Sequence, residues 1–189
     1  DISVVQDLPG VGKNLQDHLQ VKINYACEKS ITLEGADSLW NLLKYLVLKR
    51  GPLTSNVAEA GGFTSVSEES DRPDIQFHFG PSYSVNHGFD NPDGHGFWLG
   101  ALCLRPESRG EIRLRSDEPT ADPVIDPQYL TEGDDLEVLL EGVKLVREIL
   151  QAAPFDEYRG DEVAPGADAQ PDEELIEHIR ETAESLYHP

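Results

Sequence analysis

The amino-acid sequence predicts an α+β fold, in which a mostly antiparallel sheet of about five or six strands carries flanking helices. Segments with the two-residue alternation of β-strands fill the first two-thirds of the chain, and helical periodicity dominates the last third. The strands do not alternate with helices in the βαβ pattern that builds parallel sheets. At 189 residues, the chain is long enough to bury the core of one domain or one and a half.

Five segments either alternate apolar and polar side chains or form a continuous apolar run, as strands do. They are residues 21–27, 59–66, 75–79, 97–104 and 111–115. Residues 1–20 are predicted to be a glycine-rich loop and then a helical turn that Asn14 or Asp17 could cap. The turn-forming Ser108–Gly110 predicts that residues 111–115 pair back on the strand before them.

Three segments have the periodicity of amphipathic helices. The first runs from Leu39 to about Lys49, follows a cap at Asp37 or Ser38, and is apolar on more than one side. We therefore expect it to pack against a missing domain or a second subunit of a homo-oligomer. The second helix starts at Asp134 or Asp135 and stops before Pro154, and the third starts at Pro171 and includes Leu186. Residues 156–170 are expected to be a polar connection.

The chain is strongly acidic, with 36 Asp and Glu against 15 Lys and Arg and a net charge of -21. The acids are spread along the sequence, which favours a salt-adapted prokaryotic protein in the cytoplasm over an acidic mesophilic enzyme. Nucleic acid and anionic membranes are poor partners for such a surface. No apolar run reaches the length of a membrane span.

Cysteine and histidine spacing gives no sign of a metal site. Cys27 and Cys103 lie in strand-like segments without a CxxC spacing, and they are expected to be buried free thiols, with a single disulfide as the alternative. His78, His87 and His95 are irregularly spaced, so we expect no dedicated metal site.

Four segments resemble one protein family in the same order. They are Asp7–His18 (DLPGVGKNLQDH), Gly51-Pro52 with Glu59–Phe63 (EAGGF), Ser108–Leu114 (SRGEIRL) with Asp126–Leu130 (DPQYL), and Tyr187-His188-Pro189. Together they are similar to the glucose–methanol–choline (GMC) oxidoreductases, and most to choline dehydrogenase-like members. The resemblance implies a flavoenzyme that oxidises an alcohol CH–OH group by hydride transfer to FAD, with choline or a similar small alcohol as substrate. It also implies that residues 1–20 end the FAD-binding part and that residues 21–189 form the substrate-binding domain.

The resemblance further implies that this chain is an internal fragment. It contains no methionine, starts within a strand-like run and stops in an active-site segment. The family's GxGxxG dinucleotide fingerprint and its second catalytic residue, a histidine or asparagine, are expected outside these residues. The isolated fragment should therefore be inactive without the missing FAD-binding domain. Whether the parent is an oxidase or a dehydrogenase stays open.

Three residues are the candidates for the site. His188 matches the family's active-site histidine, and an imidazole can accept the alcohol's hydroxyl proton. Glu59 is either a structural carboxylate or an anchor for a trimethylammonium group. His87 is a candidate for the pocket wall, ahead of His95, whereas His78 alternates with two phenylalanines as a sheet-face residue. The rival function is a stand-alone, non-catalytic binding module that reuses the fold.

Overall fold

A computed structural model describes residues 3, 5–67 and 71–188. Within these ranges the larger sheet contains β2 (Leu19–Cys27), β3 (Ala60–Thr64), β4 (Ile75–Gly80), β5 (Gly96–Cys103), β8 (Arg159–Ala164) and β9 (Glu184–Ser185). The strand order is β3-β4-β5-β2-β8, and β9 also pairs with β2. Every pairing is antiparallel. The prediction of a mostly antiparallel sheet with flanking helices is confirmed.

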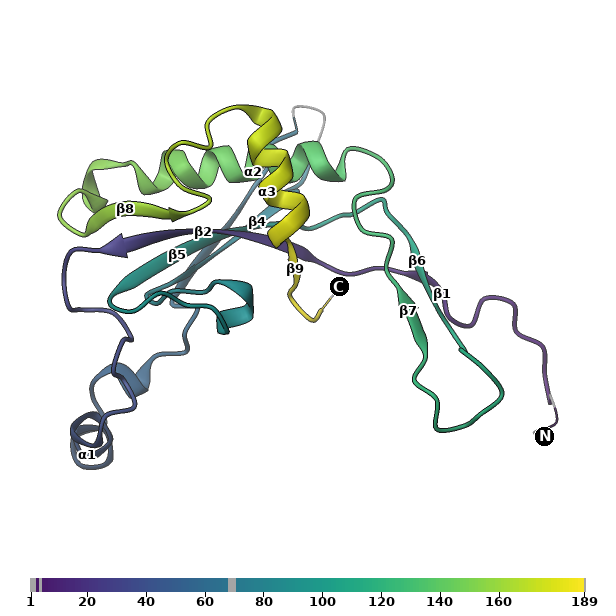
Figure 1. The fold of residues 1–189 in the computed structure, drawn as a ribbon, viewed down its shortest axis with the longest axis horizontal. Helices are drawn as coiled ribbons and strands as arrows, with labels where there is room; N and C mark the ends of the chain where they lie inside the picture. Colours follow the sequence, from purple (N-terminus) through teal and green to yellow (C-terminus); the bar gives the residue numbers. More distant parts are fainter. Residues whose placement is uncertain (1–2, 4, 68–70, 189) are drawn as a thin grey trace.

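A second, three-stranded sheet lies beside the larger one, as Figure 1 shows. It consists of β1 (Lys13–Leu15), β6 (Gly110–Arg113) and β7 (Val124–Asp126), in the order β1-β6-β7. The expected pairing of residues 111–115 with the preceding strand is therefore wrong, because β6 pairs with β1 and β7. The expected helical turn before residue 20 is also wrong, because the chain forms β1 there and β2 begins at Leu19.

The Asp135 carboxylate explains why the chain leaves the larger sheet after β5. It accepts hydrogen bonds from the backbone N–H groups of Glu107 (2.7 Å) and Ser108 (3.0 Å). These bonds fix the connection after β5 to the first turn of α2. The next strand is thus directed away from β5 and forms the second sheet.

The described helices are α1 (Leu39–Leu48), α2 (Asp135–Leu150) and α3 (Asp172–Thr182), with 3-10 turns at residues 52–54, 86–88 and 153–155. Their positions confirm the three predicted helices, and the Ser38 side chain caps α1. The third helix ends before Leu186, because β9 begins at Glu184. The polar connection 156–170 contains a strand that the sequence did not predict, β8.

The two faces of the larger sheet differ in chemistry. Directly paired residues share a face, so the row Val21, Ala101 and Phe77 belongs to one face. That face packs on α2, where Gly142 approaches the side chains of Ile75 and Ala101. Among the described residues, the buried core cluster consists of Leu19, Val21, Ile23, Tyr25, Ile75, Phe77, Phe97, Leu99, Ala101, Cys103, Leu139, Leu140, Val143, Val146, Leu150, Leu175 and Ile179.

The opposite face, which we call the polar face, carries the row Gln20, Lys22 and Asn24 on β2. On the neighbouring strands its members include His78 and Trp98. In Figure 1 the C-terminal tail after α3 and the turn at residues 86–88 lie on this side of the sheet, away from α2. The polar face therefore meets the segment that carries His188.

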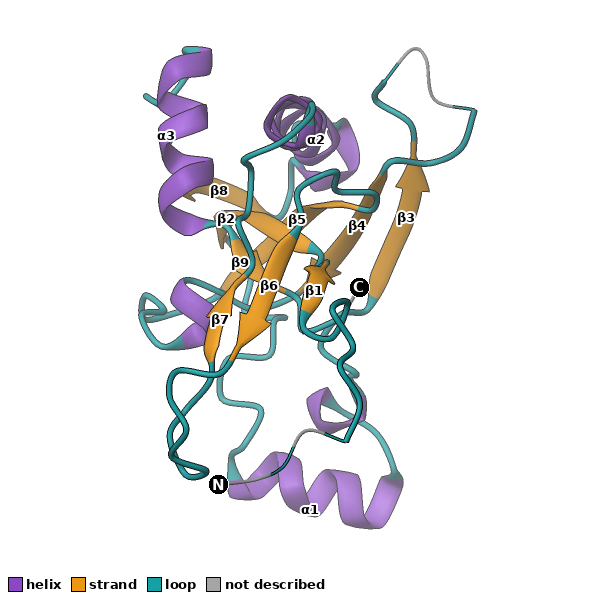
Figure 2. Ribbon diagram, turned by 90° about the vertical axis from the view of Figure 1, so that its right-hand side faces the viewer, coloured by secondary structure: helices purple, strands orange, loops and turns teal. Residues whose placement is uncertain are grey.

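Helix α1 stands apart from both sheets, and Figures 1 and 2 agree on this. None of its residues is buried, and Leu39, Trp40 and Val47 each expose more than 70% of their surface. The expectation that α1 packs on something outside this chain stays a prediction. Within the described residues, no helix has both the length and the apolar character that crossing a bilayer requires.

Candidate active site

The C-terminal tail is attached to the start of β2. Strand β9 pairs with β2 through Leu19 with Ser185 and Gln20 with Glu184. Beyond this ladder, the His18 N–H donates to the His188 carbonyl (3.1 Å), and the Leu186 N–H donates to the His18 carbonyl (3.0 Å). The backbone of His188 is thus held beside His18, the last residue of the Asp7–His18 segment.

The ring of His188 contacts a second histidine. Its centroid lies 5.1 Å from that of His18, with an angle of 76° between the ring planes, which is an edge-to-face arrangement. His188 itself is exposed. On β4, burial lowers the pKa of His78, and the nearby His188 adds to this effect. Three histidines from distant parts of the sequence therefore meet at this site.

His87 is also brought to the C-terminal tail. Its Nδ1 lies 2.7 Å from the Tyr187 hydroxyl, and its backbone N–H donates to Glu184 Oε2 (3.0 Å). His87 takes a left-handed backbone conformation, with φ of 54°, which directs the 86–88 turn toward the tail. Two of the three candidates are thus brought together: His188 lies on the C-terminal tail, and His87 contacts Tyr187 and Glu184 of that tail.

Lys22 links this network to the polar face. Its ammonium forms an ion pair with Glu184 and donates to the Ser84 hydroxyl (2.9 Å). It also lies 5.2 Å from the centre of the Trp98 ring. Burial lowers the pKa of Lys22 to about 8, even though Glu184 is in contact with it. This pair fastens β9, and so the tail, to the middle of the sheet.

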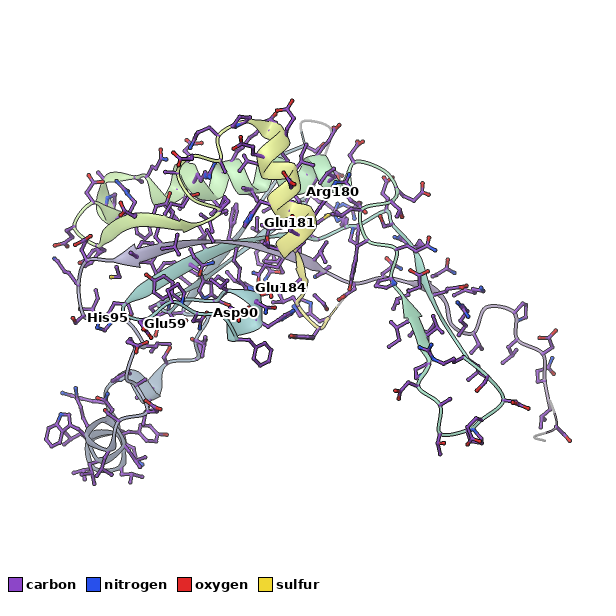
Figure 3. All side chains as sticks on the ribbon, viewed as in Figure 1. Glu59, Asp90, His95, Arg180, Glu181 and Glu184 are labelled. Carbon is purple, nitrogen blue, oxygen red and sulfur yellow. The ribbon has the colours of Figure 1, made fainter. Side chains whose placement is uncertain are left out.

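Glu59 occupies a different place. It borders a pocket of about 320 Å³ whose walls also include Thr32, Phe79, Phe97, Phe155 and Tyr158. The rings of Phe79, Phe97 and Phe155 lie within 6.2 Å of one another. The Glu59 side chain is exposed at the edge of β3, near His95 and the base of α1 in Figure 3, whereas Glu184 lies closer to the tail. No described cavity is lined by both Glu59 and His188.

His95 supports this pocket, because its Nδ1 lies 2.7 Å from the Thr32 hydroxyl. His78 fits the expected sheet-face position, on the polar face. Across the described ranges, no cluster of three or more His, Cys, Asp or Glu side chains has the arrangement of a metal site. Cys27 and Cys103 are both free thiols, so the alternative of a disulfide is wrong.

Several buried polar atoms near the tail lack hydrogen-bond partners. In the part of the chain that the structure describes, these are His18 Nδ1, both amide atoms of Gln20 and the Trp98 indole nitrogen. Buried polar atoms are normally paired, so these atoms mark a surface that another molecule or another part of the protein can complete. Gln20 and Trp98 belong to the polar face. His18 lies two residues before Gln20, so strand alternation directs it to the same side.

Comparisons with known proteins give the class of this chain. Residues 106–189 match the family model described as GMC oxidoreductase. An alcohol dehydrogenase [acceptor] from Pseudomonas putida is 42% identical over all of this chain and 35% of its own length. An oxygen-dependent choline dehydrogenase from Pseudomonas savastanoi is 41% identical, and one from Chromohalobacter salexigens is 40% identical, each over all of this chain and 34% of its own length.

Residues 106–189 of the chain belong to the GMC oxidoreductase family, and the whole chain is similar to members of it. It spans about a third of the length of the curated relatives that it matches. The fold is also that of pyridoxine 4-oxidase from Mesorbium loti, with a TM-score of 0.79 and 24% identity over all of this chain and 34% of that one. A formate oxidase has a TM-score of 0.81 and 20% identity over 95% of this chain and 37% of its own.

Sequence reasoning did not single out His18, Lys22 or Glu184. His18 was part of the Asp7–His18 segment that carried the resemblance, and this was the only signal for it. Lys22 and Glu184 are 162 positions apart, and neither has a spacing that suggests a pair.

Proposed function

We propose that this chain is the substrate-binding part of an FAD-dependent oxidoreductase that oxidises an alcohol CH–OH group, with choline or a similar small alcohol as substrate. The observation that supports it most is the exposed His188 ring, held by a backbone ladder on a face with unpartnered polar atoms. Residues 1–20 would end the FAD-binding part, and residues 21–189 would form the substrate-binding domain. The named activities of the alcohol and choline dehydrogenase relatives support the same substrate class.

FAD, held by the rest of the protein, supplies the hydride acceptor. The described residues fit the wall of a substrate site, because buried polar atoms without partners lie on the polar face and at its start beside the tail. They do not fit a dinucleotide cradle, since Gly10-Val11-Gly12 is followed by strand β1 and not by a helix. This chain would therefore contribute substrate and proton contacts, and the FAD contacts would lie elsewhere.

His188 would act as the proton acceptor. Oxidation of R–CH₂–OH to the aldehyde removes a hydride from carbon and a proton from oxygen. The hydride leaves with the electron pair of the C–H bond, and the hydroxyl proton passes to a neutral His188 nitrogen.

Glu59 would recognise a cationic substrate through its negative charge. A trimethylammonium group binds to aromatic faces through cation–π attraction and to a carboxylate through charge. The rings of Phe79, Phe97 and Phe155 border a pocket with Glu59, but they belong to the face of the sheet that packs on α2, so the contribution proposed for Glu59 is its charge. His87 would shape the entrance beside the tail through its contact with Tyr187.

The test of the reaction is a substitution in the full-length protein. His188→Gln should slow anaerobic flavin reduction by the alcohol by about 10²- to 10⁴-fold, as expected for loss of a general base. Flavin absorbance and thermal unfolding are measured on the same sample as controls for folding. Flavin reduction at the unaltered rate would contradict the proposed role of His188.

The test of the substrate compares two alcohols of the same shape. Choline and its neutral isostere 3,3-dimethylbutan-1-ol differ in the charge of one group. Glu59→Gln should lower kcat/KM for choline by roughly tenfold and leave the neutral alcohol nearly unchanged, because only the cation loses a charge partner. Equal losses for both alcohols would mean that Glu59 is structural.

The rival function is a stand-alone binding module. The isolated 189 residues mixed with FAD and choline should show no turnover, because they lack the dinucleotide fingerprint. Turnover by the isolated chain would contradict the proposal that the FAD contacts lie outside these residues. We also propose that the parent is a cytoplasmic protein of a salt-adapted prokaryote, since the chain carries a net charge of -21.

A further inference from the structure

His18 forms more contacts with the His188 segment than the strand ladder requires. Its backbone N–H donates a hydrogen bond to the His188 carbonyl, and its carbonyl accepts one from the Leu186 N–H. These bonds extend the two-residue pairing of β9 with β2 up to His188 itself. The position of the His188 backbone therefore depends on the backbone of residue 18, and a substitution of the His18 side chain leaves these two bonds in place.

The ring of His18 has a defined protonation state. Its Nε2 lies 3.0 Å from the Leu104 carbonyl, and a carbonyl oxygen can only accept a hydrogen bond. Nε2 therefore carries a proton. In the neutral imidazole, Nδ1 is then an unprotonated acceptor.

The Nδ1 atom of His18 is buried and has no hydrogen-bond partner among the described residues. A buried acceptor without a donor is unfavourable by about 1–3 kcal/mol. The neighbouring ring is that of His188, 5.1 Å away between centroids. His188 gains a second N–H group whenever it is protonated, and it can then supply the missing donor.

We propose that His18 is a positioning residue for His188: its side chain orients the His188 ring and presents an unprotonated Nδ1 to the His188 imidazolium that forms during alcohol oxidation. This inference rests on the proposed function of His188. The other titratable groups near His188 are His78 on β4 and Glu184 on β9, which is paired with Lys22. Since Glu184 is already paired with Lys22, the acceptor that His18 offers to His188 is its uncharged Nδ1.

Two matched variants of the full-length protein test the proposal. In His18→Gln, the side-chain amide reaches the place of Nε2 and can still donate to the Leu104 carbonyl, but no acceptor remains at Nδ1. In His18→Asn, the shorter side chain can place its carbonyl oxygen near the Nδ1 position, but it cannot reach Leu104. The first variant removes the proposed acceptor, and the second keeps it.

The expected result is a loss in kcat on the order of 10²-fold for His18→Gln, with KM changed by less than about twofold. The acid limb of its pH profile should move to lower pH, because the imidazolium at His188 loses the acceptor that stabilises it. His18→Asn should recover part of kcat and keep the unaltered acid limb. Equal losses in the two variants, or an unmoved limb in His18→Gln, would overturn the proposal.

A double variant separates this inference from the proposed function. If His188→Gln keeps full activity, the proposed function fails whatever His18 does. If His188→Gln is inactive and His18→Gln behaves as the unaltered protein, only this inference fails. The double variant His18→Gln/His188→Gln should be no slower than His188→Gln alone, because residues that act as a unit are not additive. If His18→Gln does not fold, His18→Asn decides: a shifted acid limb in it contradicts the proposal.

Discussion

Glycines on the polar face leave room for large side chains to lie flat on the sheet. A Cβ atom at Gly80 would come within 2.5 Å of the Trp98 indole nitrogen, and one at Gly100 would come within 2.5 Å of the Gln20 amide nitrogen. Both large side chains are buried and carry unpartnered atoms. The small residues therefore determine how the polar face is shaped near the C-terminal tail.

Gly80→Ala should destabilise the protein by about 1–3 kcal/mol, because the rigid Trp98 ring cannot move away from the new methyl group. Gly62→Ala is the matched control on the neighbouring strand. A Cβ at Gly62 meets no atom within 4 Å, so this change should be neutral or stabilise the strand by up to about 1 kcal/mol. Denaturant unfolding of both variants gives the comparison, and equal stabilities would contradict the steric argument.

The two cysteines should differ in reactivity. Burial raises the pKa of the Cys103 thiol to about 11, whereas Cys27 is half-buried and borders the pocket of Glu59. A thiol reagent at pH 8 should modify Cys27 quickly and Cys103 only after unfolding. Cys27→Ser should abolish the fast modification. Rapid labelling of two thiols in the folded protein would contradict the burial of Cys103.

The same shift predicts a pH dependence of stability. The Cys103 thiol ionises at about pH 9.0 without burial and at about pH 11 in the fold. The folded state then holds a proton that the unfolded state has lost, so this contribution is complete below pH 9 and falls as the pH rises toward 11. Cys103→Ala should remove this part of the slope in denaturant titrations between those two values.

At the scale of elements, one buried ion pair joins α2, β8 and β2. Arg147 Nη2 lies 2.5 Å from Glu162 Oε1, and the two side chains expose 9% and 4% of their surface. The Tyr25 hydroxyl donates to the same carboxylate (2.7 Å), and the carbonyl of Ala169 accepts from Arg147 (2.6 Å). Burial, followed by the bond to Glu162, raises the pKa of Tyr25 above its ordinary value.

Arg147→Met should cost about 3–5 kcal/mol of unfolding free energy, because it leaves the Glu162 carboxylate buried without its partner. Lys144→Met is the control on the same helix. Lys144 pairs with Glu141 and Asp172 at the surface, where such pairs contribute only about 0–1 kcal/mol. Thermal or denaturant unfolding measures both, and similar losses would show that net charge, and not burial, determines the effect.

The elements with strong local signals could be predicted from the sequence. Helices α1 and α2 and strands β4 and β5 have clear periodicity, and the structure confirms them. Strand β8 was missed because its sequence, Arg159–Ala164, is polar and pairs only at the edge of the sheet. The partner of β6 was predicted wrongly because strand pairing over about a hundred residues leaves no local pattern.

The candidate site follows the same rule. The family resemblance identified His188, Glu59 and His87, but it could not show which of them meet. The ladder between β9 and β2 is only two residue pairs long and joins positions more than 160 residues apart. The contacts of His18 and Lys22 with the tail could not be predicted from the sequence, because they depend on this long-range pairing and not on local spacing.

At the scale of the whole molecule, charge repulsion opposes folding at low salt. A net charge of -21 repels itself over distances of about 10 Å at 0.1 M salt, and over about 3 Å at 1 M. On α3, Glu173, Glu177 and Glu181 follow one another at four-residue spacing and are exposed. Like charges at this spacing destabilise a helix by about 0.2–0.5 kcal/mol per pair.

The melting temperature should therefore rise by several degrees between about 0.1 M and 1 M KCl, as screening removes repulsion worth a few kcal/mol. Glu177→Gln removes the middle charge of the row on α3, so it should raise stability by up to about 1 kcal/mol at low salt and by less at high salt. Sucrose at equal osmolality is the control, because it favours the compact state without screening charge. A melting temperature that is constant or falls with KCl, or a Glu177→Gln effect that does not shrink with salt, would contradict charge repulsion as the cause. A rise specific to KCl would instead mean that the acidic surface is suited to concentrated salt, where its carboxylates no longer repel one another.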